Sequence, residues 1–315
     1  MHNQCKFSVA ALIVALVCLT GTLAYGDYIC GDANSDEAVN VADAVWIINY
    51  VFASGDPPNP LDAGDTNCDG SCNITDAVWI INYIFAGGYT PCDTDGDGFP
   101  DCGLNCPGTV VDIDGNVYQT VLIGGQCWMA ENLKVTHYRN GDPIPNVTDV
   151  AEWIDLSTGA YCDYYNDPAN VPTYGRLYNW YAVDDSRNIA PEGWHLPSDA
   201  EWKQLEMYLG MSQAEADSTL FRGTDEGGKL KEAGYAHWIP PNEGATNESG
   251  FTALPGGFRD YDGSFYCMGI TAFFWSSTEF SSGSAWIRGL YYNLSPVNRY
   301  YSPKHYGLSV RCVKD

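Results

Sequence analysis

The sequence predicts a multidomain chain, with a small all-α module followed by a larger α+β domain. Three observations support this prediction. Acidic residues crowd the stretch 27–108, a loop-and-helix unit is duplicated inside it, and the composition changes at Thr109. From there Trp, Tyr and Gly become abundant, and about 200 residues are enough for one substantial core. We predict a leader at 1–26 and a helical module at 27–92. An acidic linker follows at 93–108, and the C-terminal domain occupies 109–315.

The first 26 residues have the pattern of a secretory signal peptide. Lys6 precedes an apolar run at 7–19, and the small residues Ala24 and Gly26 suit a cleavage site. This run is too short to span a membrane, and no later segment is apolar over the required length. We therefore expect a secreted protein, extracellular or at the cell surface, without a membrane span.

The charge distribution argues against nucleic acid as a partner. The formal net charge is −25, and residues 27–108 hold 14 Asp and Glu but no Lys or Arg. Such a chain repels polyanions and anionic membranes. Because the acidic block also contains apolar runs, it predicts a cation site rather than a disordered tail. Ten cysteines follow the leader, and an even number in an exported chain favours disulfides, whose pairing the spacing leaves open.

The duplicated unit joins an oxygen-rich loop to a helix. Residues 31–55 and 64–88 are related by an offset of 33, and the sequence DAVWIINY recurs in both. Calcium takes about six to eight oxygen ligands, which loops supply from positions 1, 3, 5, 7, 9 and 12. With backbone carbonyls at position 7, these predicted ligands are Asp32, Asn34, Asp36, Ala38, Asn40 and Asp43, and Asp65, Asn67, Asp69, Ser71, Asn73 and Asp76.

The two loops are expected to differ in their affinity for calcium. Gly70 supplies the sharp turn at position 6 of the second loop, whereas Glu37 in the first would adopt a left-handed conformation at a cost of about 1 kcal/mol. We therefore expect the first site to be weaker. Asn40 and Asn73 also suit helix N-caps, but capping does not explain the other alternating acids, which would repel one another without a cation.

This pattern resembles the type I dockerins, EF-hand-like modules in which each calcium loop is followed by one helix. The resemblance covers residues 30–90. It implies Ca²⁺ as the cofactor and a cohesin-like or other surface protein as the partner. In that family loop positions 10 and 11, often Ser-Thr, contact the cohesin. Here they are Val41-Ala42 and Ile74-Thr75, which departs from the pattern.

The two predicted helices have almost no polar face, at 45–52 and again at 78–85. A helix that is apolar all round must be buried on several sides, and a unit of about 60 residues has little core of its own. Two explanations remain open. The helices pack against each other and the downstream domain, or they bind an external partner.

A third acidic loop follows at 93–107 and alternates Asp with other residues. The candidate calcium ligands in it are Asp93, Asp95, Asp97 and Asp101. The segment resembles a single thrombospondin type-3 calcium repeat, with Leu104 where that family has a further Asp. The alternative is a solvated linker. Cys102 and Cys106 could pair with each other or reach Cys92.

Local patterns predict several elements of the C-terminal domain. A hairpin is expected at 110–121 around Asp114-Gly115. Ser198 and Glu201 form a capping box at the start of a helix ending at Leu209. Further strands are expected at 285–292, 297–301 and 308–313.

Short motifs give this domain a close resemblance to the Fibrobacter succinogenes major paralogous domain. They are DGNVY at 114–118, WMAENL at 128–133, YNWY at 178–181, GWHLPS at 193–198, LPGG at 254–257, WSST at 275–278 and SVRC at 309–312. The family is exported, and its pattern is similar to the C-type lectin-like fold of formylglycine-generating enzymes. Because the first and last strands lie together in this family, the resemblance implies Cys127–Cys312 as the preferred disulfide, with Cys162–Cys267 second.

No motif in this domain selects a catalytic site. The histidines lack the His-Glu-x-x-His spacing, and no Gly-x-Ser-x-Gly elbow is present. His195 lies between Trp194 and Leu196, where a hydrogen-bonded structural role is expected. The 26 acidic residues of 109–315 leave a glycosidase-type carboxylate pair open. An enzyme related to the formylglycine-generating group is a further hypothesis.

Aromatic side chains instead favour a binding role. Flat aromatic faces suit sugars or peptides, and one predicted hairpin carries Trp286, Tyr291, Tyr292, Tyr300 and Tyr301. The alternative is that alternate members form the core. We therefore expect a non-catalytic calcium-binding protein whose helical module docks or braces and whose C-terminal domain presents a ligand surface. The alternative is a component of an extracellular polysaccharide-degrading assembly that binds or acts on glycan.

Overall fold

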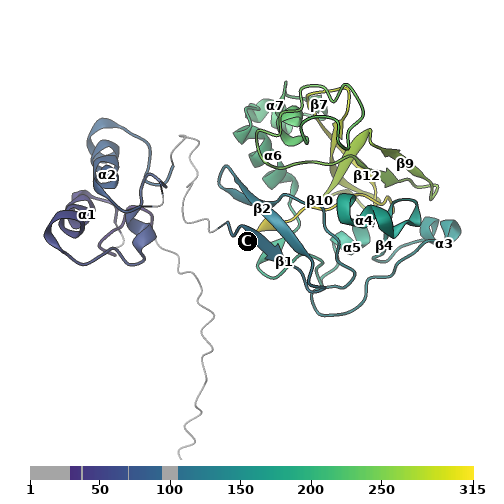
Figure 1. The fold of residues 1–315 in the computed structure, drawn as a ribbon, viewed down its shortest axis with the longest axis horizontal. Coiled ribbons are helices and arrows are strands. Elements are labelled where there is room, and N and C mark those ends of the chain that lie inside the picture. Colours follow the sequence, from purple (N-terminus) through teal and green to yellow (C-terminus); the bar gives the residue numbers. More distant parts are fainter. Residues whose placement is uncertain (1–28, 37, 70, 94–105) are drawn as a thin grey trace, which may run out of the picture.

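The computed structural model describes residues 29–36, 38–69, 71–93 and 106–315. Figure 1 shows a helical part and a β-rich part, each built around its own hydrophobic core. The predicted multidomain layout is therefore confirmed. The predicted signal peptide at 1–26 lies outside the described residues, as do Glu37, Gly70, Asp95, Asp97 and Asp101.

The helical part contains α1 (Val41–Ala53) and α2 (Ile74–Ala86), with the short 3-10 helix η1 (Leu61–Gly64) between them in sequence. Both α-helices begin at an asparagine, Asn40 or Asn73, whose side chain accepts a hydrogen bond from the first turn. An Asp at the third helical position completes a capping box in each copy. Both helices therefore begin where the repeat predicts.

The core of the helical part lies between the two copies. Ala44 and Ile47 of α1 and Ala77 and Ile80 of α2 are at most 1% exposed and form one cluster. The small alanines allow the helices to approach closely, and each isoleucine fills the space beside them. Packing between the copies is thus confirmed, and it leaves Val45 and Phe52 of α1 and Val78 and Phe85 of α2 exposed.

The β-rich part contains two larger sheets and a two-stranded pair. The five-stranded sheet has the order β1-β2-β3-β13-β6, with strands Thr109–Val111, Val117–Ile123, Gln126–Met129, Val313–Lys314 and Trp194–His195. The six-stranded sheet has the order β7-β12-β11-β10-β8-β9, with strands Leu220–Arg222, Val297–Pro303, Ser284–Tyr291, Thr271–Ser281, Gly256–Arg259 and Phe265–Met268. The pair is β4 (Tyr161–Cys162) and β5 (Leu177–Tyr178).

Short helices connect these strands. They are α3 (Val150–Ile154), η2 (Tyr164–Asn166), η3 (Pro168–Asn170), α4 (Val171–Tyr174), α5 (Trp180–Val183), α6 (Asp199–Tyr208), α7 (Gln213–Asp217) and α8 (Glu226–Leu230). The capping box predicted for α6 is confirmed, because Ser198 and Glu201 bond each other's backbone N–H groups. Trp202 and Leu205 of α6 are buried against the sheets.

The predicted strand pairs form, but the last strand is shorter than expected. β1 pairs with β2 around Gly115, and β11 pairs with β12, both antiparallel. Of the stretch 308–313, only Val313 lies in a strand; Leu308 and Ser309 make isolated bridges to Tyr178 and Phe274. This segment crosses from one sheet to another, so no single neighbour pairs along its length.

Both predicted disulfides of the C-terminal domain are wrong. Cys127 is bonded to Cys106, with Cα atoms 5.2 Å apart, and Cys312 is a buried free thiol. β13 does lie beside β3, as expected. However, the chain entering β1 is held against β2 by a hydrogen bond from the Thr120 N–H to the Gly108 carbonyl, which brings Cys106 to Cys127. The alternatives that paired Cys106 with Cys102 or Cys92 are also wrong.

Cys162 and Cys267 are free thiols as well. Phe265 and Met268 of β9, rather than Cys267, pack against the cluster that contains Cys162. Burial raises the pKa of the Cys162 thiol to about 12. A thiol with so high a pKa lacks the environment of a reactive cysteine.

A buried cluster of charges links α6 to the six-stranded sheet. Arg288 of β11 donates to Glu206 at 2.6 Å and to Asp199 at 2.8 Å. Arg222 also pairs with Glu206, and Arg299 pairs with Asp199 at 2.7 Å. Burial alone would raise the pKa of Asp199, but the Arg299 and Arg288 guanidinium groups outweigh it and hold this pKa at about 2.

His195 makes the stability of this domain depend on pH. Its ring nitrogens lie 2.6 Å from carboxylate oxygens of Glu201 and Asp315, so the expected hydrogen-bonded histidine is confirmed. The Glu201 contact, helped by Asp315 and opposed by burial, raises the pKa of His195 to about 8, above ~6.5 in an unfolded chain. The stabilisation is therefore fully present below about pH 6.5 and is lost as the pH rises through about 8.

Thermal unfolding between about pH 6 and pH 9 checks this expectation. The wild-type domain should lose stability more steeply across the interval than His195→Gln, because glutamine has no proton to release there. Parallel slopes for the two proteins would show that His195 does not carry the pH dependence.

Candidate metal centres

The first loop brings three carboxylates together at the start of α1. One oxygen from each of Asp32, Asp36 and Asp43 lies within 4.8 Å of the others. Backbone N–H groups hold these side chains in place: Asp36 N donates to Asp32 at 2.9 Å, and Asn34 N donates to Asp43 at 3.2 Å. The carbonyl of Ala38 accepts from a neighbouring asparagine amide at 3.1 Å. Three of the six predicted ligands of this loop therefore converge.

The second loop repeats the same hydrogen bonds 33 residues later. Asp69 N donates to Asp65 at 3.1 Å, and Asn67 N donates to Asp76 at 3.2 Å. Asn73 donates from its side-chain amide to the Ser71 carbonyl at 2.8 Å. The two loops differ in sequence between their predicted ligand positions but make the same hydrogen bonds. The spacing of the polar residues therefore determines the loop conformation. The expectation of a weaker first site rests on Glu37, which lies outside the described residues.

The donor set fits a hard divalent cation. Asp43 and Asp76 are fully buried, and the stretch 27–108 contains no Lys or Arg. Burial raises the pKa of both carboxyl groups, and backbone N–H donors lower it in part. A nearby carboxylate raises the pKa further, Asp32 for Asp43 and Asp65 for Asp76. A divalent cation would offset this cost, and carboxylate, amide and carbonyl oxygens are the ligands that calcium prefers. The residues present therefore fit Ca²⁺.

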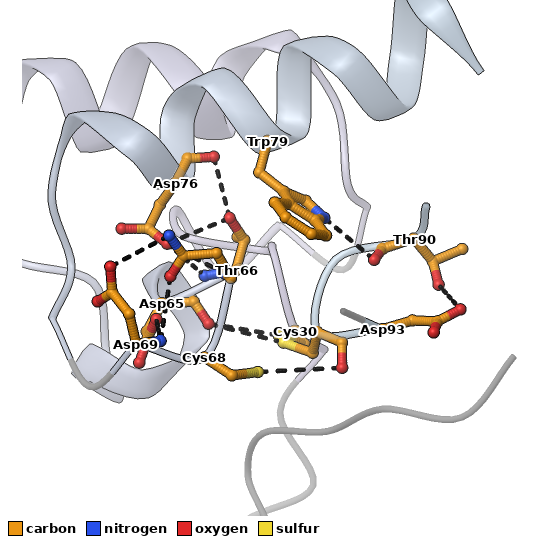
Figure 2. The surroundings of a disulfide bond; sticks show 11 residues. Cys30, Asp65, Thr66, Cys68, Asp69, Asp76, Trp79, Thr90 and Asp93 are labelled. Atoms are coloured by element: carbon orange, nitrogen blue, oxygen red, sulfur yellow. Dashed lines mark hydrogen bonds between the residues drawn. A yellow bond between two sulfur atoms is a disulfide. The ribbon is translucent and has the colours of Figure 1, made fainter. Parts of the chain in front are cut away.

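A disulfide closes the ends of the helical part beside the second loop. Cys30 is bonded to Cys92, and their Cα atoms are 6.1 Å apart. Figure 2 shows that this bond lies next to Asp65 and Cys68. The N–H of Cys92 donates to the Thr66 carbonyl at 2.8 Å, and the indole of Trp79 donates to the Thr90 carbonyl at 3.2 Å. The first and last residues of the module are thus fixed to one another.

Two threonines of the second loop were missed by sequence reasoning. Thr66 is fully buried, and its hydroxyl donates to the Asp76 carbonyl at 3.0 Å; its counterpart in the first copy is Ala33. Thr75 bonds the side chains of Asn67 and Asn73. Comparing the two copies residue by residue was the available signal, because both positions differ between the copies.

Only one predicted ligand of the acidic linker can be placed. Asp93 is buried, and its carboxylate lies 3.4 Å from the Thr90 hydroxyl. The other three predicted ligands lie outside the described residues, so a third calcium site stays a prediction.

Four of the five aromatic residues predicted as a ligand surface are linked by shared contacts, and Tyr292 lies apart from them. Tyr291 and Tyr300 line a cavity on the six-stranded sheet. Tyr301 stacks on Phe280, with ring centroids 4.0 Å apart, and also contacts Trp286. Tyr292 packs against a separate core cluster. Tyr300 also stacks on Tyr301, with ring centroids 4.4 Å apart, so it joins the cavity to the Tyr301–Trp286 cluster.

Comparison with known families agrees with this two-part organisation. The model of the Fibrobacter succinogenes major domain matches residues 121–314, which is more than half of the chain. The chain belongs to the Fibrobacter succinogenes major domain family. A second family model, the dockerin type I domain, matches residues 30–85, so the helical part is a dockerin domain. No curated protein and no solved structure matches the chain.

The dockerin match agrees with the loop geometry. Type I dockerin domains bind calcium, and the loops of this domain carry the oxygen ligands that calcium requires. Loop positions 10 and 11 lie in the first turns of α1 and α2. In the Fibrobacter succinogenes major domain, the C-type lectin-like fold stays a prediction.

Proposed function

We propose that this chain is a secreted, non-catalytic calcium-binding protein. Its dockerin domain, loaded with Ca²⁺ by the two loops, docks onto a cohesin-like partner, and its Fibrobacter succinogenes major domain presents a ligand-binding surface. Export through a cleaved leader at 1–26 is part of this proposal. Within the described ranges, no helix has the length and apolar character needed to cross a bilayer.

A matched pair of apolar surfaces on α1 and α2 supports the docking role. Val45 and Val78 are 49% and 47% exposed, and Phe52 and Phe85 are 69% and 72% exposed. These residues are related by the 33-residue repeat, so each helix offers the same surface. Exposed apolar patches of this kind mark protein interaction sites. Packing between the copies accounts for one face of each helix, and a partner accounts for the other.

Capture of cohesin domains by the immobilised chain tests this proposal. We expect capture in calcium but not in chelator. The double variant Val45→Asp/Val78→Asp should weaken capture about 30-fold or more, because truncating or charging a central contact costs about 2 kcal/mol or more. Leu61→Asp, on η1, is the matched control because Leu61 is 45% exposed but lies outside both helices. An equal loss of capture in the double variant and in Leu61→Asp would place the contact elsewhere. If none of the cohesin domains tested is captured in a calcium-dependent way, cohesin docking is refuted.

A second candidate function places the chain in an extracellular polysaccharide-degrading assembly, with the C-terminal domain holding glycan. The cavity beside Tyr291 and Tyr300 supports it, because aromatic walls with a few polar groups suit sugars. A glycan array separates the two candidates. Selective glycan binding supports the second, whereas binding to protein alone supports the first.

A further inference from the structure

We propose that the C-terminal domain binds a neutral sugar residue in the cavity on the six-stranded sheet; this inference rests on the second candidate function. The cavity has a volume of about 340 Å³, near the lower end of the range of about 300–1,000 Å³ that is usual for ligand sites. It therefore suits one or two sugar rings. Its lining comes from β7, β8, β10, β11 and β12 and from the segments that follow β8 and β12.

Strand alternation directs a polar row into this cavity. Successive side chains of a strand point to opposite faces of a sheet. Asn298, Tyr300 and Ser302 of β12 line the cavity, whereas the intervening Arg299 turns the other way and pairs with Asp199. The charge cluster on the opposite face thus fixes the orientation of β12, and with it the row that faces the ligand.

Two polar side chains in this row are available to a ligand. Asn298 is 7% exposed and Ser302 is 9% exposed. Across the described part of the C-terminal domain, neither the Asn298 amide nor the Ser302 hydroxyl makes a hydrogen bond to protein, and neither is a fully buried atom without a partner, so both are open to water in the cavity. Both of these groups can donate and accept. A ligand that carries hydroxyl groups would replace the cavity water with direct hydrogen bonds to them.

The walls of the cavity offer flat apolar surfaces. Phe258 and Tyr306 have nearly parallel rings, 5° apart in plane with centroids separated by 6.2 Å. Phe273 and Tyr291 meet edge to face at 5.7 Å. Rings held by such contacts keep their orientation without a ligand, and the C–H face of a pyranose packs on surfaces of this kind.

Charge selects a neutral ligand over a charged one. Asp260 lines the cavity, and no Lys or Arg does so among the described residues. An anionic ligand would meet the Asp260 carboxylate without a compensating cation. An ammonium group would suit Asp260, but it cannot itself accept from the Asn298 amide N–H, so a hydroxyl group is still required there. A sugar hydroxyl donates to the carboxylate and accepts from the amide, so it satisfies both.

A glycan array probed with the intact oxidised chain in calcium is the first step of the test. The array carries neutral, uronate-containing and amino-sugar oligosaccharides. Binding to neutral glycans is expected. Binding confined to uronates or amino sugars, or no binding, overturns the proposal.

Calorimetry with the best neutral glycan then locates the site. Asn298→Ala and Ser302→Ala should each weaken binding at least about tenfold, the loss of roughly one hydrogen bond to a buried group. Asn293→Ala is the matched control, because Asn293 is exposed in the turn between β11 and β12. If Asn298→Ala fails to fold, Ser302→Ala decides. Unchanged affinity in the cavity variants, or an equal loss in Asn293→Ala, overturns the assignment of the cavity.

Cohesin capture by the same proteins separates this inference from the docking role. Normal calcium-dependent capture without glycan binding counts against the cavity alone. Glycan binding that depends on Asn298, in a chain that captures no cohesin, counts against docking alone.

Discussion

Replacing Asp76 with asparagine is expected to abolish calcium binding at the second loop while changing the calcium-free stability by no more than about 1 kcal/mol. The asparagine oxygen can still accept from the N–H groups of Thr66 and Asn67, which donate to Asp76 Oδ1 at 2.8 and 3.2 Å. The bond from Asn73 N to Oδ2 is lost, at a cost of about 1 kcal/mol. Removing a buried negative charge offsets this cost, because burial disfavours the ionised Asp76 carboxyl and raises its pKa.

Calcium should reveal the difference between the two proteins. A ligand present at about 1,000 times its Kd stabilises a folded domain by about 4 kcal/mol per site. Wild-type dockerin should gain this stabilisation from both loops, whereas Asp76→Asn should lose one binding step in a calorimetric titration. Asp56→Asn makes the same change of charge at an exposed residue outside the loops and should leave both steps intact. A normal titration for Asp76→Asn would remove the second loop from the candidate sites.

Replacing Glu206 with glutamine is expected to destabilise the C-terminal domain by about 3–5 kcal/mol, the usual cost of removing one partner of a buried ion pair. Glu206 is fully buried and bonds both Arg222 and Arg288. Glutamine nearly preserves the shape of the side chain, so the loss comes from two guanidinium groups that keep their charge in a buried site. Asp199 does not compensate, because Arg288 and Arg299 already bond its carboxylate.

Denaturant unfolding followed by tryptophan fluorescence measures this loss. Trp202 of α6 is buried, and the Arg288 guanidinium lies 5.9 Å from its ring, so its emission reports on the region of the cluster. Glu248→Gln is the control, since Glu248 is exposed and should change stability by no more than about 0.5 kcal/mol. A loss below about 1 kcal/mol for Glu206→Gln would mean that water enters the cluster and solvates the arginines.

The elements of the dockerin domain could be predicted because their chemistry is local. All ligands of one loop lie within about 12 residues, and the same asparagine and aspartate that belong to the loop also begin the helix. A repeat then tests each assignment a second time. What the repeat could not predict is the contacts made at positions where the two copies differ. Thr66 replaces Ala33, and only the structure shows its hydroxyl bonded to Asp76.

The C-terminal domain was predictable only where neighbours in sequence are neighbours in space. The capping box of α6 and the β11–β12 pair depend on residues a few positions apart, and both form. The pairing of Cys127 depends instead on how the acidic linker enters β1, which no spacing encodes. Asn298 was missed for a related reason. A short polar residue among aromatic ones has no distinctive pattern until strand alternation places it in a cavity.

The bond between Cys30 and Cys92 determines how the dockerin domain carries mechanical load. A pull applied at Cys92 passes through the disulfide to Cys30, directly before the first loop. Without that bond, a pull would peel α2 away first and α1 afterwards, one calcium loop at a time. With it, both loops are loaded together, so rupture requires them to fail in the same event. The two halves of the dockerin domain would therefore resist such a pull as one unit.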